Sequence, residues 1–246
     1  MIKDISVILN VYKRPETLEK QIQVIKNQSI KIKSENIHVW YNKSDLAQYA
    51  PKDKYIKTYY SNWNTKFFGR FLIPSLIRTE YVAIFDDDLL PQPDWFKNCL
   101  DSMEKQEGIY GGSGVLVKTK EAYHPHIKFG WNGQHSNNIE RVDLVGHAWF
   151  FKQEWIKYMW MEKPVSWDNG EDIMFSYLCQ KYGGINTFVP PHPESNKNLW
   201  CTEYQHAMKV GSDENSSWKI GNHLSLRGQV VKECVKNGWK LTIMNR

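Results

Sequence analysis

Cysteine is scarce in this chain of 246 residues, and the sequence has neither a long apolar run nor a large excess of one charge. The four cysteines lie far apart and form no CxxC pair, which argues against a zinc ribbon and a disulfide scaffold. No stretch approaches the roughly 18 apolar residues of a transmembrane segment, and the apolar run near the N-terminus is too short for a signal peptide. We therefore expect a cytoplasmic protein with at most peripheral membrane contact.

Charges of both signs are spread along the whole chain. There are 32 Lys and Arg against 27 Asp and Glu, a formal net charge of +5, without a block of like charge. Zinc-finger spacing, RGG tracts and RNA-recognition signatures are missing, so we expect no nucleic-acid partner. Hydrophobic residues make up 41% of the chain, which is enough to bury a full core. Because no linker or internal repeat divides the chain, we expect a single domain over residues 1–246.

Apolar runs alternate with helical patterns along the chain. Residues 5–11 read as a strand, and a helical pattern opens at Pro15. The further expected strands are 37–41, 81–85, 109–117, 142–151 and 185–189, and the further expected helices are 67–77, 93–105, 170–182 and 222–236. Residues 119–139 lack periodicity and are predicted to form a loop. This alternation predicts an α/β fold with a mostly parallel central sheet flanked by helices, whose ligands lie beyond the carboxyl ends of the strands.

Three aspartates, Asp86, Asp87 and Asp88, follow directly on the apolar run YVAIF. On an extended segment Asp86 and Asp88 point to one side and Asp87 to the other, so the first and third can converge on one ligand. Mg²⁺ or Mn²⁺ bridging two phosphates takes such hard carboxylate oxygens. A solvated acidic turn is the plain alternative, but clustered charges at the end of a buried strand are costly unless something binds them. We therefore predict a metal site here.

Five segments in this order resemble glycosyltransferases of the GT-A type, particularly the large inverting family two and the exostosin-type transferases. They are ISVILNVYKRPETLEKQI, NTKFFGRFLIPS, YVAIFDDDLLPQPDWF, VGHAWFF and WDNGEDIMFSYLC, within residues 4–182. The resemblance implies a Rossmann-like GT-A fold and an Mn²⁺- or Mg²⁺-dependent, inverting transfer. The donor would be a nucleotide-diphosphate sugar such as a UDP-sugar, and the acceptor a carbohydrate or glycoconjugate. Residues from 1 to about 105 would bind the donor, and those from about 106 to 246 the acceptor.

The same resemblance implies a donor site. In these families the loop after the first strand holds the base and ribose, and the segment before the DxD strand brings an arginine to the donor. The donor-binding residues implied in this way are Asn10, Val11, Tyr12, Arg14, Asn42, Arg70, Asp86 and Asp87. A tyrosine can stack on a uracil, and an arginine fork suits diphosphate oxygens. The metal ligands would be Asp86 and Asp88, and many such enzymes add a late histidine, here His206 or else His223.

The pair Glu171 and Asp172 opens a helical pattern. An inverting transferase must deprotonate the acceptor hydroxyl, and the family places that base in such an acidic pair. We take Asp172 as the base and Glu171 as a contact to an acceptor hydroxyl, although the roles can be exchanged and first-turn acids also stabilise helices without catalysis. Trp167, Trp149 and Asp168 are the expected acceptor contacts, the tryptophans through their apolar ring faces. Since asparagine keeps the shape of aspartate and can cap a helix, Asp172→Asn is expected to change stability little.

Three other functions remain open at this point. An exostosin-like transferase that retains the anomeric configuration shares the late acidic pair. A sugar nucleotidyltransferase has a similar nucleotide-binding domain, but it would show a Gly-rich phosphate loop, and VILNVYKRPETL has no glycine. A non-enzymatic carbohydrate-binding module would explain the aromatic residues but not the carboxylates.

Overall fold

One continuous sheet of nine strands organises the residues that the computed structural model describes, 4–214, 216–219 and 221–245. Its order is β3-β2-β1-β4-β8-β5-β9-β7, and β6 pairs with β5 beside this path. The strands are β1 Ile5–Val11, β2 Ile37–Tyr41, β3 Lys57–Tyr60, β4 Tyr81–Phe85, β5 Ile109–Val117, β6 His126–Gly130, β7 Glu140–Val142, β8 Leu144–Lys152 and β9 Thr187–Val189. Strands β1 to β5 and β9 run in one direction and β6 to β8 in the other, so the sheet is mostly parallel, as predicted.

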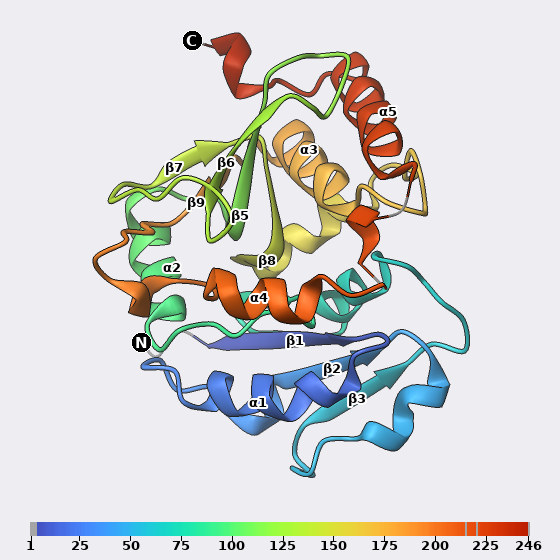
Figure 1. The fold of residues 1–246 in the computed structure, drawn as a ribbon, viewed down its shortest axis with the longest axis vertical. Coiled ribbons are helices and arrows are strands. Elements are labelled where there is room, and N and C mark those ends of the chain that lie inside the picture. The colour runs from blue at the N-terminus through green and yellow to red at the C-terminus, as the bar shows by residue number, and fades with distance from the viewer. Residues whose placement is uncertain (1–3, 215, 220, 246) are drawn as a thin grey trace.

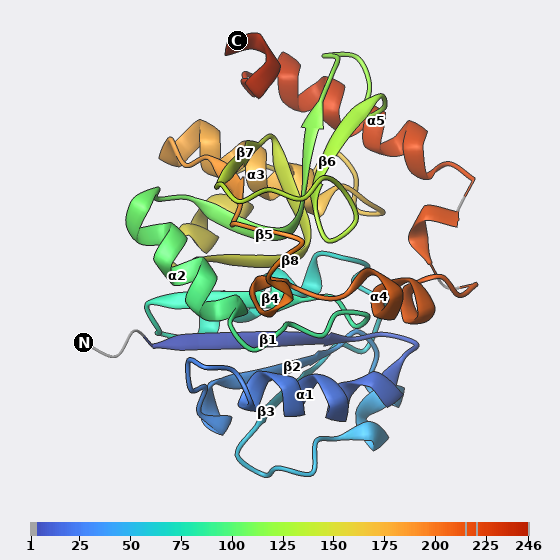
Figure 2. The same cartoon turned by 60° about the vertical axis from the view of Figure 1, so that its left-hand side comes forward.

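Five α-helices flank the sheet in the described part of the chain. They are α1 Leu18–Lys26, α2 Trp95–Lys105, α3 Glu171–Gly183, α4 Tyr204–Gly211 and α5 His223–Lys236. Helix α1 packs on β1, α3 packs on β8, and α5 packs on α3. Figures 1 and 2 show α1 beside β1 to β3, and α3 with α5 beside β5 to β8. The predicted α/β fold class is therefore confirmed, and none of the described helices has the length and apolarity needed to cross a membrane.

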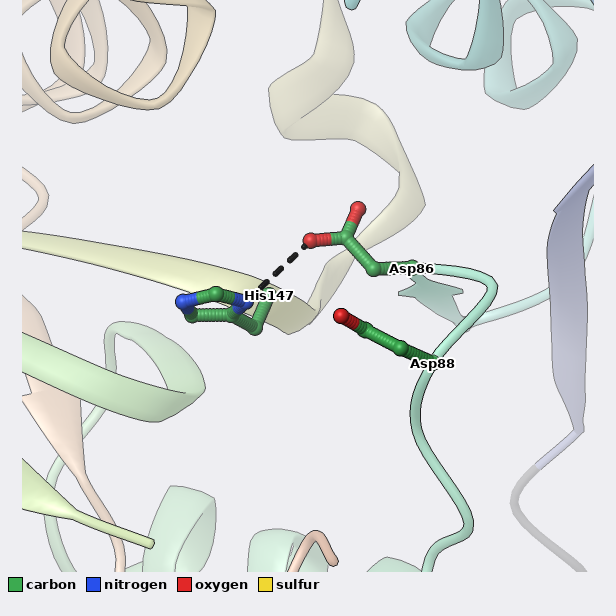
Figure 3. Close-up of side chains that lie close together, drawn as sticks. All are labelled: Asp86, Asp88 and His147. Carbon is green, nitrogen blue, oxygen red and sulfur yellow. Dashed lines mark ion pairs between the residues drawn. The ribbon is translucent and has the colours of Figure 1, made fainter. Parts of the chain in front are cut away.

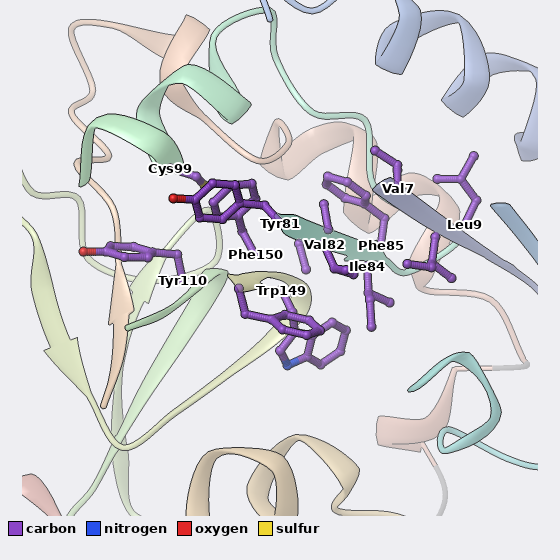
Figure 4. Close-up of a cluster of buried hydrophobic side chains, with 14 of the residues drawn as sticks. Val7, Leu9, Tyr81, Val82, Ile84, Phe85, Cys99, Tyr110, Trp149 and Phe150 are labelled. Carbon is purple, nitrogen blue, oxygen red and sulfur yellow. The ribbon is translucent and has the colours of Figure 1, made fainter. Parts of the chain in front are cut away.

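The central strand β4 is buried along its whole length. Its five residues are between 0% and 4% exposed, because β1 and β8 pair with it and helices cover the sheet. Figure 4 shows its side chains packed with those of β1, β5, β8 and α2. The continuous apolar run YVAIF follows from this burial on both faces. The strand ends where this burial ends, because the chain reaches the polar carboxyl edge of the sheet at Asp86.

Three segments differ from the sequence-based expectation. The predicted helix 67–77 forms two short 3₁₀ turns, Gly69–Phe71 and Ile73–Leu76, since Pro74 lacks the amide that an α-helix needs there. The predicted loop 119–139 contains β6, in which Ile127 and Phe129 pack on the core while the residues between them alternate to the other face. Residues 190–217, a polar stretch for which the sequence predicted no helix, contain α4.

Candidate active site

A turn of three aspartates follows β4 at the carboxyl edge of the parallel strands. The Asp86 amide donates to the His147 carbonyl oxygen at 2.9 Å, which ties the turn to β8. The buried side chain of Gln21, on α1, donates from Nε2 to the carbonyl oxygens of Asp86 and Leu89 at 2.7 and 3.0 Å. The turn is therefore held between a strand and a helix that are far apart in the sequence.

Asp86, Asp88 and His147 form a cluster beyond this edge (Figure 3). Their potential ligand atoms all lie within 4.8 Å of one another, and His147 Nδ1 is 3.4 Å from Asp86 Oδ2. Asp88 Oδ1 is buried without a hydrogen-bond partner among the described residues. A buried acceptor of this kind needs a partner, and a divalent cation would supply one. Two carboxylates and an imidazole therefore form a possible site for a divalent cation.

The electrostatics of the turn also favour a bound cation. Burial, followed by the charge of Asp86, raises the pKa of Asp88. Burial also raises the pKa of Asp87, to about 7, although Arg14 opposes the shift. For Asp86, the charge of Arg70 and the hydrogen bond from His147 outweigh burial and lower the pKa. Asp88 is therefore the carboxylate of the cluster that resists ionisation, and a divalent charge would relieve it.

His147 was not singled out from the sequence as a metal ligand. It lies inside the quoted segment VGHAWFF, which was the available signal. Its backbone has a φ of 64°, in the left-handed region that side chains other than glycine adopt rarely. Such conformations occur most often where function requires them.

Asp87 is not part of this cluster and pairs instead with Arg14. Arg14 Nη1 donates to Asp87 Oδ1 at 2.8 Å, while Nη2 and Nε donate to the two Asp213 oxygens at 2.7 and 3.1 Å. The guanidinium of Arg14 is thus paired with Asp213, from the segment that follows α4. Gly211 brings that segment against Asp88, since a Cβ there would lie 2.2 Å from Asp88 Oδ2. The C-terminal part of the chain therefore covers the aspartate turn.

Arg70 connects the aspartate turn to the late acidic pair. It is 3% exposed, binds Asp86 through Nη1, and donates from Nη2 to Glu171 Oε1 at 2.9 Å. The guanidinium lies 4.7 Å from the centre of the Trp149 ring, which is 1% exposed. The expected role of Trp149 as an acceptor platform is therefore wrong, because its ring is buried and supports Arg70.

Glu171 and Asp172 occupy the first turn of α3. Arg227, on α5, donates to Asp172 Oδ1 at 3.0 Å and to Oδ2 at 2.7 Å, and both side chains are buried. The same guanidinium donates to Asn169 Oδ1 at 3.0 Å and lies 4.3 Å from the centre of the Tyr123 ring. Burial, followed by the charge of Asp172, raises the pKa of Glu171 to about 7. Sequence reasoning missed Arg227 because nothing in the pattern of α5 points to a partner in α3.

The predicted base-binding residues lie around the end of β1. Tyr12 is half-buried, and its hydroxyl accepts a hydrogen bond from Asn64 Nδ2 at 3.0 Å. Asn42 is 2% exposed and uses its amide to order the loop after β3, bonding to Asn64, Thr65 and Lys66. The contact predicted between the Asn42 side chain and a donor is therefore corrected to a structural one. Two other predicted donor residues are Val11, whose side chain is in the core, and Asn10, which is half-buried.

Two predicted acceptor residues are accessible. Trp167 is 50% exposed and packs edge-on against Phe68, with ring centres 5.0 Å apart. Asp168 is exposed, and its Oδ1 lies 3.5 Å from Lys66 Nζ. Both residues lie in the loop that leads into α3, so they border the acidic pair.

The two late histidines lie elsewhere in the described structure. His206, on α4, lines a separate polar cavity of about 300 Å³ together with Lys20 and Glu203. His223, at the start of α5, has Nδ1 3.1 Å from Asn169 Nδ2. Within the described residues, the histidine that groups with the two aspartates is instead His147.

A mostly parallel sheet with an acidic cluster at its carboxyl edge and a second acidic pair facing it defines a glycosyltransferase of the GT-A type. The sequence model described as glycosyl transferase family 2 matches residues 6–160, more than half of the chain. The protein belongs to this family. The matched region includes the aspartate turn and His147 but ends before Glu171 and Asp172. Comparison with curated proteins gave no match.

Proposed function

We propose that the protein transfers a sugar from a UDP-sugar or related nucleotide-diphosphate sugar to a hydroxyl group of a carbohydrate or glycoconjugate, with inversion at the anomeric carbon. One observation carries this proposal: Arg70 joins the cluster of Asp86, Asp88 and His147 to the acidic pair that begins α3. The proposed sites for the leaving diphosphate and for the base would then be adjacent, as a single displacement requires.

The donor would lie between β1 and the aspartate turn. Mn²⁺ or Mg²⁺ held by Asp86, Asp88 and His147 would neutralise the leaving diphosphate. Arg14 would bind the same phosphates through its guanidinium. The phosphates would compete for it with Asp213, its partner in this structure. Tyr12 would stack on the base from the end of β1, where it is partly accessible.

Asp172 is the proposed general base, and Arg227 fixes the orientation of its carboxylate. Asp172 Oδ1 accepts hydrogen bonds from Arg227 and from the Ile173 amide, whereas Oδ2 accepts only from Arg227 among the described residues, so Oδ2 keeps a lone pair that can accept a proton. A Cβ built on Gly146 would lie 3.4 Å from Asp172 Oδ2, so this oxygen faces β8 beside His147. Glu171 is the alternative base, because its pKa of about 7 suits proton transfer.

The deciding experiment is a panel of nucleotide sugars assayed for hydrolysis with Mn²⁺, with Mg²⁺ and with EDTA, which needs no acceptor. We expect hydrolysis of at least one donor, dependent on metal and lost in Asp88→Ala. Asp101→Ala removes an exposed carboxylate on α2, outside the site, and is the matched control. If no nucleotide sugar is bound or hydrolysed with either metal, the proposal is refuted. Once an acceptor is found, NMR of the product decides between inversion and the retaining alternative.

A further inference from the structure

Next to Asp172, one face of the sheet carries a row of residues with small side chains or none, which we call the floor. Ser113 of β5 pairs with Gly130 of β6 on one side and with Gly146 of β8 on the other. Residues directly opposite one another in antiparallel strands share a face, so these three form one row. A Cβ at Gly146 would meet Asp172 Oδ2 and no other described atom within 4 Å. Gly130 is closely packed, since a Cβ there would lie 2.2 Å from the Gly112 carbonyl oxygen, so the row leaves open space in front of the proposed base at Gly146 alone.

Lys128 stands at the margin of this floor. It pairs with Val115, which pairs with Leu144, so all three project to the same face of the sheet as the row of small residues. Val115 and Leu144 are buried under α3 and α5, which places Lys128 at the edge of that packing. The half-buried lysine side chain is thus brought to the side of the site where α5 carries Arg227.

The ammonium group of Lys128 has no compensating anion among the residues that the structure describes. In the described part of the chain it forms no ion pair and no side-chain hydrogen bond. Burial, followed by the positive charge of Arg227, lowers its pKa, and Lys128 in turn opposes protonation of His126 and His147. The charge of Arg227 is balanced by Asp172, whereas that of Lys128 is not. A partly buried cation among other basic groups is costly unless an anion binds it.

We propose that Lys128 binds an anionic group, a carboxylate or a phosphate, carried by the acceptor. The assignment to the acceptor rests on the proposed function, in which Asp172 activates the acceptor hydroxyl. Lys128 shares its face with the floor before Asp172, whereas the donor phosphates have Arg14 and the aspartate turn. The enzyme would therefore select acidic acceptors, such as uronic acids or sugar phosphates, over neutral ones.

Binding of three small probes tests this selectivity directly. Methyl glucuronide, glucose 6-phosphate and methyl glucoside are titrated by NMR into the protein saturated with UDP and Mn²⁺. We expect an anionic probe to bind about ten- to hundredfold more tightly than methyl glucoside, the usual worth of a charged hydrogen bond. Lys128→Gln should remove the preference and Lys128→Arg should keep part of it. Lys118→Gln, at an exposed lysine just after β5, is the matched control and should leave it unchanged. The anionic probe that binds more tightly shows whether the site prefers a carboxylate or a phosphate.

A second measurement does not depend on choosing the right sugar. Because the ammonium is uncompensated, Lys128→Gln should unfold at the same temperature as the wild type or higher, whereas loss of a structural lysine would lower it. A lowered unfolding temperature, or a wild type without preference for either anionic probe, overturns the proposal. So does a preference that survives in Lys128→Gln. If the variant instead changes discrimination between UDP-glucuronate and UDP-glucose, the anion belongs to the donor and the acceptor assignment fails. None of these binding and stability measurements requires turnover, so failure of the hydrolysis assay is recognised separately.

Discussion

Replacing Asp172 by asparagine removes the only carboxylate that pairs with Arg227 in the described structure. Arg227 is 6% exposed, so the variant leaves a buried guanidinium without a counter-charge. Breaking a buried ion pair from one side typically costs about 3–5 kcal/mol. In a domain of this size, 1 kcal/mol shifts the unfolding temperature by about 2–4 °C, so we expect a decrease of roughly 6–20 °C. This revises the sequence-based expectation of nearly unchanged stability, which considered only the shape of the side chain and the helix start.

Low activity in such a variant could reflect either lost catalysis or lost stability, and a double variant separates the two. In Asp172→Asn with Arg227→Met both charges are gone, and replacing a whole buried pair by neutral groups is often neutral or stabilising. We expect the unfolding temperature to recover most of its decrease. Turnover should remain about 10²- to 10⁴-fold low, the usual worth of a general base, with near-normal donor affinity. Thermal unfolding, calorimetry with UDP and steady-state transfer rates measure these three quantities.

Two results would refute this reasoning. If Asp172→Asn is as stable as the wild type, the ion pair does not stabilise the fold. If the double variant regains turnover together with stability, Asp172 serves only to balance Arg227. Glu171→Gln is the companion variant, and its inactivity beside an active double variant would exchange the two roles.

Three further predictions concern the donor site and the pH dependence of stability. Asp88→Ala should abolish Mn²⁺-dependent UDP binding in calorimetry without unfolding the protein, while His206→Ala should leave it intact; unchanged affinity in Asp88→Ala would exclude the aspartate as a ligand. Tyr12→Ala should weaken UDP and UDP-sugar equally, by the roughly 1–3 kcal/mol of a lost stacking contact, and an effect confined to the acceptor would contradict the assignment. Burial, followed by the charge of Lys57, lowers the pKa of His38 from 6.5 to about 4, so the unfolded chain binds a proton that the fold excludes. Stability should therefore fall as the pH drops from about 6.5 to 4, and His38→Gln should flatten that decline in urea unfolding; an identical decline would show that other groups cause it.

Local patterns predicted the parts of the fold that depend on neighbouring residues. The run YVAIF identified β4 because a strand covered on both faces must be apolar throughout. The alternation of side chains on an extended segment predicted that Asp86 and Asp88 converge, and the two lie together in the structure, although Asp87 and Asp88 form a turn and not an extended segment. The periodicity of Leu18, Ile22 and Ile25 predicted α1, in which all three are buried.

Contacts between distant segments were beyond sequence reasoning. His147 reaches the aspartate turn because β8 lies antiparallel beside β4, and no local signal tells which strands will be neighbours. Arg227 meets Asp172 through the packing of α5, and the proposed role of Lys128 depends on the register of β6; a pattern of residues specifies neither. The predictions for Asn42 and Trp149 failed for a different reason. A polar or aromatic side chain near a strand end can be structural as easily as functional.

The division into a donor half and an acceptor half stays a prediction, and the charges at the site argue that the two halves act as one unit. Arg70, from the first half, is buried between Asp86 of the same half and Glu171 of the second. Arg14 is likewise shared between Asp87 and Asp213. Separating the halves would leave each of these arginines without one of its carboxylates, at a cost that burial makes large for Arg70. The same sharing predicts that a cation held by Asp86 would compete with Arg70 for this carboxylate, which would leave Glu171 as the remaining partner of the guanidinium. Donor binding would thereby be linked to the charge balance of the acidic pair that begins α3.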